Sequence, residues 1–118
     1  MDFGQLKGNI SSISHRPDLA TSMPLFVDTA REKINRRFRL ALVSFTTDTD
    51  TNAVLTECPL IYIYASLQAL HEFINNGDNA IYYKSLWDDE CSLQNISGGF
   101  ASTDPLYIDT PPVITPEP

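Results

Sequence analysis

The stretch that decides the fold is residues 56–77, TECPLIYIYASLQALHEFINNG. Thr56 is a suitable N-cap, because its hydroxyl can accept a hydrogen bond from a free backbone N–H, and Gly77 suits the left-handed position that closes a helix. After Pro59 the only charged residue is Glu72, and apolar residues follow helical spacing on two faces: Leu60, Ile63, Tyr64, Leu67, Leu70 and Ile74 on one, and Ile61, Ala65, Ala69 and Phe73 on the other. A helix that is apolar on nearly all sides is buried, so the pattern predicts a central helix covered by the rest of the chain or by other subunits.

A short amphipathic helix is predicted over residues 2–13. Asp2 is a possible N-cap, and the apolar face consists of Phe3, Leu6, Ile10 and Ile13. Gly4 and Gly8 each cost about 1 kcal/mol of helix propensity relative to Ala, so the helix needs packing partners. The same two glycines would let another stretch of backbone approach closely.

A second amphipathic helix is predicted over residues 23–42, opened by Ser22 as N-cap and by Pro24 in its first turn. Its apolar stripe repeats every four residues: Phe26, Ala30, Ile34, Phe38 and Leu42. On the opposite side, Glu32 can pair with Arg36 one turn later. The end of this segment is ambiguous, since residues 41–47 either extend the helix or form one short strand.

The last helix is predicted over residues 79–97, with Asp78 as its cap. Its stripe of Tyr82, Tyr83, Leu86, Trp87 and Leu93 is interrupted by the acidic residues Asp88, Asp89 and Glu90. The connection from the central helix is only about two to four residues long, so the two helices should lie antiparallel. The prediction for residues 1–97 is therefore a mainly α fold, a small antiparallel helical bundle.

Residues 98–118 have a different composition. Gly98-Gly99 forms a hinge, and the following residues carry five prolines and no basic residue. This segment is predicted to be an extended, Pro-rich C-terminal arm that orders on a partner, because it holds more apolar residues than a plain linker needs. The candidate partner-binding residues in the arm are Phe100, Leu106, Tyr107, Ile108, Val113 and Ile114.

Charge is distributed unevenly along the chain. The net charge is −7 overall, but residues 16–39 carry six basic and three acidic residues, whereas residues 40–118 carry only Lys84 against eleven acids. The densest positive patch is RRFR, residues 36–39, so Arg31, Arg36, Arg37 and Arg39 are candidate partner-binding residues. Two interpretations stay open: a solvated helix end that favours basic residues, or a contact surface for an acidic protein or a phosphate backbone.

Residues arranged for catalysis or metal binding are not evident. His15 and His71 have no Cys or Ser in a recognisable arrangement, and the chain has no phosphate-binding loop and no nucleophile elbow. Cys58 and Cys91 fit two small buried thiols in a reduced cytosolic compartment. No signal peptide and no bilayer-spanning run is evident. The sequence thus predicts a non-enzymatic protein without cofactor, metal or membrane.

Two segments together resemble the head-to-tail adaptor, or connector, proteins of tailed bacteriophages, mainly short-tailed ones. In residues 18–40, DLATSMPLFVDTAREKINRRFRL, the matching positions are Met23-Pro24, Phe26-Val27, Ala30, Ile34-Asn35-Arg36 and Phe38-Arg39. In residues 48–93 they are Thr51-Asn52, Leu55, Pro59, Tyr62, Tyr64, Leu67 and Leu86-Trp87. Many members of this family carry a β-rich insertion between the second and third helices, which is here reduced to residues 41–55.

The resemblance implies a structural virion protein. It would form a ring, expected to be dodecameric, between the portal and the tail or nozzle, and would form part of the channel through which DNA is ejected. The implied partners are the portal protein, a tail or nozzle protein, neighbouring copies of the chain, and genomic DNA in passage. The implied location is the head–tail interface of the virion, assembled in the bacterial host cytoplasm. The alternative is a small intracellular regulator that binds DNA through Arg36–Arg39.

Overall fold

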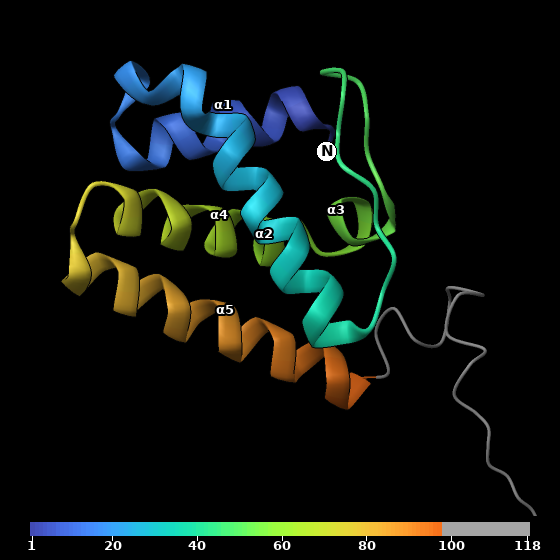
Figure 1. Cartoon of the computed structure of the whole chain (residues 1–118). Coiled ribbons are helices and arrows are strands. Elements are labelled where there is room, and N and C mark those ends of the chain that lie inside the picture. Colours follow the sequence, from blue (N-terminus) through green and yellow to red (C-terminus); the bar gives the residue numbers. More distant parts are fainter. Residues whose placement is uncertain (98–118) are drawn as a thin grey trace, which may run out of the picture.

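The computed structural model describes residues 1–97, and these residues form helices with no strand among them, as predicted. The elements are α1 (Phe3–Ser14), the 3-10 helix η1 (Pro17–Ser22), α2 (Met23–Phe38), α3 (Ala53–Glu57), α4 (Pro59–Phe73) and α5 (Gly77–Ser97) (Figure 1). The predicted arm, residues 98–118, lies outside the described residues. The division into two parts at residue 97 therefore stays a prediction.

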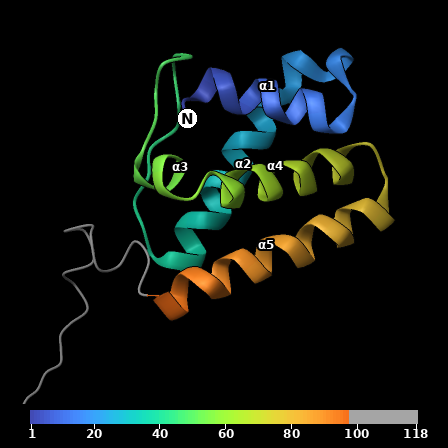
Figure 2. The same cartoon turned by 180° about the vertical axis from the view of Figure 1, so that it is seen from behind.

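Helix α4 is the centre of the fold, as its apolar pattern predicts. It contacts α1, α2, α3 and α5, and it lies between α1 and α5 while α2 crosses one side of it (Figures 1 and 2). Helices α4 and α5 run antiparallel and pack together, which confirms the expectation from their short connection.

The core is built around the side chains of α4. Tyr62, Ile61, Leu67 and Leu70 are fully buried, and they meet buried residues from every neighbouring element: Leu6, Ile10, Phe26, Ile34, Leu55, Trp87 and Cys91. Two residues of the predicted apolar faces are exposed instead: Leu60 (42%) and Phe73 (54%), at the two ends of the helix. Ile13 is also exposed, so only the first three residues of the predicted apolar face of α1 reach the core.

The predicted ends of the central helix are wrong. Thr56 lies inside α3, and the chain breaks at Cys58 (φ −139°, ψ 68°) before α4 begins at Pro59. The proline explains the break, because its ring disfavours helical geometry at the preceding residue. At the other end Asn75, not Gly77, adopts the left-handed conformation (φ 59°), and Gly77 is already the first residue of α5.

At the other helix boundaries, hydrogen bonds identify the residues that cap each helix. The side chain of Asp2 accepts from the backbone N–H of Gln5 at 2.9 Å, in a capping box that confirms the predicted start of α1. Ser22 precedes α2 as predicted, but its side chain makes no capping hydrogen bond. Asn76, rather than Asp78, accepts from the N–H of Asn79 at the start of α5 (3.3 Å).

Helix α2 ends at Phe38, four residues earlier than predicted. Arg39 takes the left-handed conformation (φ 56°), and the N–H of Leu40 then donates to the carbonyl of Asn35 at 3.0 Å. The side chain of Asn35 also holds Leu42, accepting from its N–H (2.9 Å) and donating to its carbonyl (3.0 Å). These bonds satisfy the end of the helix and turn the chain away from it.

The residues between α2 and α3 form an extended excursion, neither the helix nor the strand considered for residues 41–47 (Figure 1). Its tip is joined to α1, since Phe3 N–H donates to the Asp50 carbonyl (2.8 Å) and Gly4 N–H to the Asp48 carbonyl (2.9 Å). A Cβ atom on Gly4 would lie 3.1 Å from the Cβ of Asp48. The close approach expected from the glycines of this helix is thus found at Gly4.

Candidate interaction surfaces

Arg31 holds contacts within the chain. Its side chain is only 15% exposed; Nε donates to Asp28 Oδ1 at 2.8 Å, and Nη1 donates to the carbonyl of Leu42 at 3.0 Å. Arg31 and Ser44 lower the pKa of the Asp28 carboxyl by donating hydrogen bonds to it. The guanidinium therefore ties α2 to the extended excursion, and little of it remains for a partner.

The other three predicted arginines lie at the end of α2. Arg37 Nη1 is 3.3 Å from Asp88 Oδ1 of α5, and its guanidinium lies 5.6 Å from the centre of the Trp87 ring. Arg36 and Arg39 are exposed. The expected pair between Glu32 and Arg36 is absent, because Glu32 instead approaches Arg31 at 3.7 Å. The structure thus separates the RRFR patch into one arginine engaged with α5 and two that face solvent.

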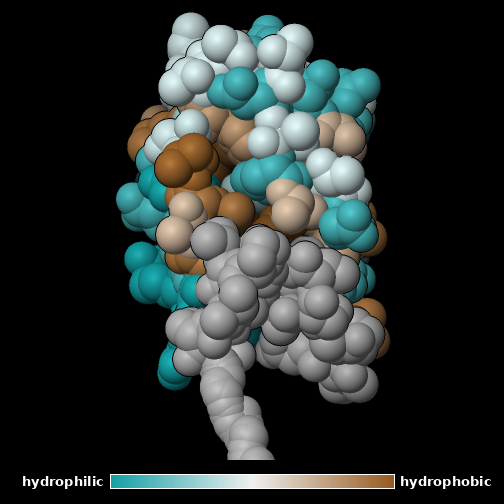
Figure 3. All heavy atoms as spheres, turned by 90° about the vertical axis from the view of Figure 1, so that its right-hand side faces the viewer, coloured by the Kyte–Doolittle hydropathy of each residue, from teal (hydrophilic) through white to brown (hydrophobic). Residues whose placement is uncertain are grey.

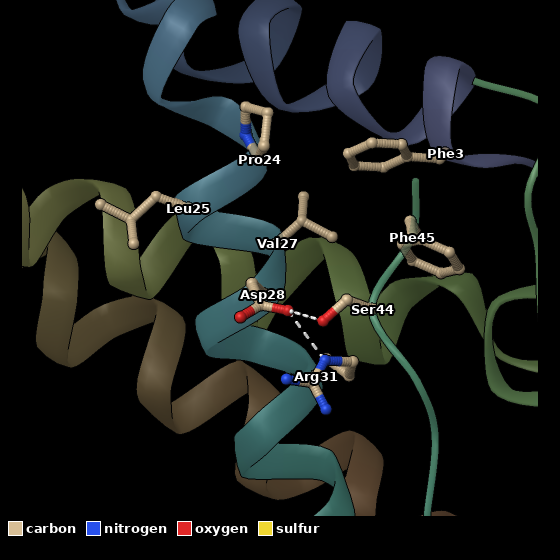
Figure 4. Close-up of a pocket in the computed structure, with 8 residues that line it drawn as sticks. All are labelled: Phe3, Pro24, Leu25, Val27, Asp28, Arg31, Ser44 and Phe45. Atoms are coloured by element: carbon tan, nitrogen blue, oxygen red, sulfur yellow. Dashed lines mark hydrogen bonds and ion pairs between the residues drawn. The ribbon is translucent and has the colours of Figure 1, made fainter. Parts of the chain in front are cut away.

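A groove lies between α2 and the extended excursion, and the sequence reasoning did not find it. It has a volume of about 300 Å³. Figure 4 shows Phe3, Val27 and Phe45 among its lining residues. The rings of Phe3 and Phe45 stack with their centroids 5.1 Å apart, and Ser44 donates to Asp28 at 2.7 Å. Its volume is at the lower limit of about 300–1,000 Å³ for small-molecule sites. Its walls are largely apolar, so it suits one or two aliphatic side chains.

The extended segment Val43–Phe45 also borders a second hollow of about 480 Å³, whose other lining residues are Thr46, Asp50, Thr51 and Asn52. Val43 itself is 80% exposed, the largest exposure among the large apolar side chains whose burial the structure describes. The face of the molecule that carries this segment shows hydrophobic surface between polar patches (Figure 3). An apolar residue so exposed beside two hollows marks this segment as a candidate contact surface.

The excursion is fixed at its ends by residues that carry the resemblance. Asn52 accepts from the N–H of Leu55 at 2.9 Å, and its amide donates to the hydroxyl of Tyr62 at 3.0 Å. Tyr62 is fully buried, and burial raises the pKa of its hydroxyl to about 12. Asn35 performs the equivalent task at Leu42. The matching asparagines therefore frame the excursion where it leaves α2 and where it enters α3.

Groups suited to chemistry are dispersed. His71 is buried and its ring stacks on Tyr83 at 5.3 Å, but its Nδ1 has no partner within residues 1–97, so it is not the fully hydrogen-bonded histidine of a typical bundle. Cys91 is fully buried and Cys58 half-buried, and burial raises the pKa of the Cys91 thiol to about 12. In the described part of the chain no three His, Cys, Asp or Glu side chains come together as a metal site.

None of the helices in residues 1–97 combines the length and the apolar character that crossing a bilayer requires.

The predicted contact residues of the arm, Phe100, Leu106, Tyr107, Ile108, Val113 and Ile114, lie outside the described residues. Comparison of the chain with family models, with curated proteins and with solved structures finds no match.

Proposed function

We propose that the chain is a structural virion protein, a head-to-tail adaptor of a tailed bacteriophage that forms a ring between the portal and the tail or nozzle. The ring is expected to be dodecameric and to form part of the DNA channel. The observation that carries this proposal is the set of hydrogen bonds that fixes the two ends of the excursion. Asn35, Asn52 and Tyr62 all belong to the resemblance, and all three hold the excursion or its junctions.

The position of the excursion supports the same proposal. It leaves the helical body between α2 and α3, where many members of the family carry their β-rich insertion. Both junctions are held by asparagine side chains, since Asn35 bonds to the backbone of Leu42 and Asn52 caps α3 and reaches Tyr62. An exposed segment held on a small helical body suits a protein that works through contacts with other subunits.

The distribution of charge sets the proposed orientation of the subunits in the ring. Arg36 and Arg39 are exposed at the end of α2, and they are proposed to face a neighbouring protein. The acidic residues that follow Leu40 are proposed to contribute to the channel side, where an acidic wall repels DNA phosphate and lets the genome slide.

Assembly provides the main experiment. The purified full chain would be mixed with the portal protein encoded in the same genome, and native mass spectrometry would be recorded for the free chain and for the mixture. The expected result is a monomer or weak oligomer alone and a closed ring on the portal. No binding to the portal would overturn the adaptor function, and a stable ring of the free chain would overturn portal-dependent assembly.

The alternative function, a DNA-binding regulator, is favoured only by the exposure of Arg36 and Arg39. Its electrostatic signature would be duplex binding by the free monomer that weakens steeply with salt. Fluorescence anisotropy with a labelled duplex at two salt concentrations separates the two functions. Tight, salt-sensitive binding by the monomer would favour the regulator.

The proposal that the arginines face a neighbouring protein and not the channel has its own test. It is the triple substitution of Arg36, Arg37 and Arg39 by Gln. Each exposed ion pair contributes only about 0–1 kcal/mol, but a ring repeats the contact in every subunit. Attachment of the ring to portal-bearing heads should therefore weaken, while Lys84→Gln on the exposed side of α5 should leave it unchanged. Intact attachment with altered DNA ejection would place the arginines on the channel side instead.

A further inference from the structure

The excursion contains a short stretch of backbone with open hydrogen-bonding groups. On one side of it, Asn35 occupies both the N–H and the carbonyl of Leu42. On the other side, the carboxylate of Asp50 accepts from the N–H groups of Thr46 and Thr47, at 2.7 and 2.9 Å. Between these anchors, the N–H and carbonyl groups of Val43–Phe45 have no hydrogen-bond partner within residues 1–97.

This stretch is fixed in an extended form by its two anchors, so its open edge is ready to pair with another strand. The stretch borders two hollows: Ser44 and Phe45 line the groove of Phe3, Pro24 and Val27, and Val43–Phe45 line the second hollow. Successive side chains of a strand point to opposite sides. A strand that is added here therefore brings alternate side chains to one side, beside the hollows that the stretch lines.

The chain itself contains a segment of matching chemistry beyond α5. Residues 106–110, LYIDT, lie between Pro105 and Pro111, and all five keep a backbone N–H. Leu106 and Ile108 alternate with Tyr107, the pattern that presents two aliphatic side chains to one side. The eight residues 98–105 can span about 28 Å when extended. That length is close to the 31 Å second dimension of the molecule, so an arm that leaves α5 can reach an adjacent copy.

We propose that the open edge at Val43–Phe45 binds residues 106–110 from the arm of a neighbouring copy as an added strand, with Leu106 and Ile108 in the apolar groove. This inference rests on the proposed ring, and it names which partner the arm contacts. Within a ring the arm of one subunit is held beside the next at millimolar effective concentration, so even a weak individual contact is occupied.

The test uses the full chain, labelled with ¹⁵N, and a synthetic peptide of residues 102–114, STDPLYIDTPPVI. At millimolar peptide, the backbone amide signals of Val43, Ser44 and Phe45 should shift. Hydrogen exchange should slow at Val43 and Phe45, whose N–H groups share the edge opposite the Asn35 contact, and not at Ser44. A peptide carrying L106D and I108D should produce neither effect. The matched peptide with V113D and I114D should still bind, because those residues lie outside the pairing segment.

A second pair of variants tests the receiving edge. Val43→Pro removes the backbone N–H and should abolish peptide binding, whereas Val43→Ala removes only side-chain contact and should retain it. The unchanged amide signals of α4 in each variant would show that the helical body is still folded. The pair therefore distinguishes backbone pairing from simple apolar contact.

Three results would overturn the inference: no amide shift at millimolar peptide, equal shifts with the L106D/I108D peptide, or equal binding by the two Val43 variants. Hydrogen exchange at Val43 and Phe45 could instead already be slow in the free monomer and become fast in the L106D/I108D variant. That result would mean that the groove binds the chain's own arm and not the arm of a neighbour. The titration contains no portal protein. A negative result here leaves the adaptor function in place, and a failed ring on the portal leaves the titration valid.

Discussion

At the scale of single residues, Asn52 joins the start of α3 to the buried Tyr62 of α4. It caps α3 at Leu55 and donates to the buried hydroxyl of Tyr62. Asn52→Ala removes the cap, which costs about 0.5–2 kcal/mol, and leaves a buried hydroxyl without its donor. The expected loss is about 1–3 kcal/mol in the free energy of unfolding, measured in urea.

The matched control is Asn79→Ala, since Asn79 is exposed in the first turn of α5 and its backbone, not its side chain, makes the local hydrogen bond. Its expected effect is within about 0.5 kcal/mol. If both variants unfolded at the wild-type urea midpoint, Asn52 would have no structural role. Its hydrogen bonds could then not be what fixes the end of the excursion.

His71 predicts a dependence of stability on pH. Burial first, and then the positive charge of Arg16, lower the pKa of His71 below its ordinary value of 6.5. The unfolded chain therefore binds the proton more readily, so stability is highest above about pH 6.5 and falls as the pH decreases through that value. The slope contributed by one group is at most about 1.4 kcal/mol per pH unit.

The variant His71→Phe keeps an aromatic ring against Tyr83 and removes the titrating group. Its unfolding free energy should change less than that of the wild type between about pH 7.5 and pH 5.5, above the range of ordinary carboxyl groups. Equal changes in the two proteins would show that other groups carry the dependence.

At the scale of elements, α4 determines stability. Leu67 and Leu70 are fully buried, and truncation of either to Ala should cost about 2–5 kcal/mol. Leu60, on the same helix but 42% exposed, is the matched control and should lose much less when changed to Ala. Urea midpoints measure both. Equal midpoints for Leu67→Ala and the wild type would contradict a packed core around α4.

The bodies of the helices could be predicted from the sequence, because apolar spacing records which face is buried. Their ends could not. Around DTDTN and NNGDN, several residues can cap a helix. Asn52 caps the extra helix α3 and also reaches Tyr62, whereas α4 begins after Cys58 without a side-chain cap. The end of α2 depends on Asn35 holding Leu42, a contact between residues seven positions apart that no periodicity reveals.

At the scale of the whole molecule, folding reduces the charge asymmetry that the sequence suggests. Arg37 from the basic half lies against Asp88 from the acidic half, and Arg31 is occupied by Asp28. The predicted basic patch thus contracts to Arg36 and Arg39. The groove was not predictable, because it is assembled from Phe3, Val27 and Phe45, which come from three separate segments whose packing the sequence pattern does not specify.

The same packing argument predicts what the arm contributes. Among the residues whose burial the structure describes, the buried cluster runs from Phe3 to Cys91, so deletion of residues 100–118 removes none of these members. The truncated protein should keep its helical circular dichroism and its urea midpoint, yet lose stable attachment to portal-bearing heads. The full chain with L106D and I108D should reproduce that loss, whereas V113D with I114D should weaken it less. Normal attachment by the truncated protein would mean that the helical faces alone hold the ring, because no other part of the chain then remains to bridge its subunits.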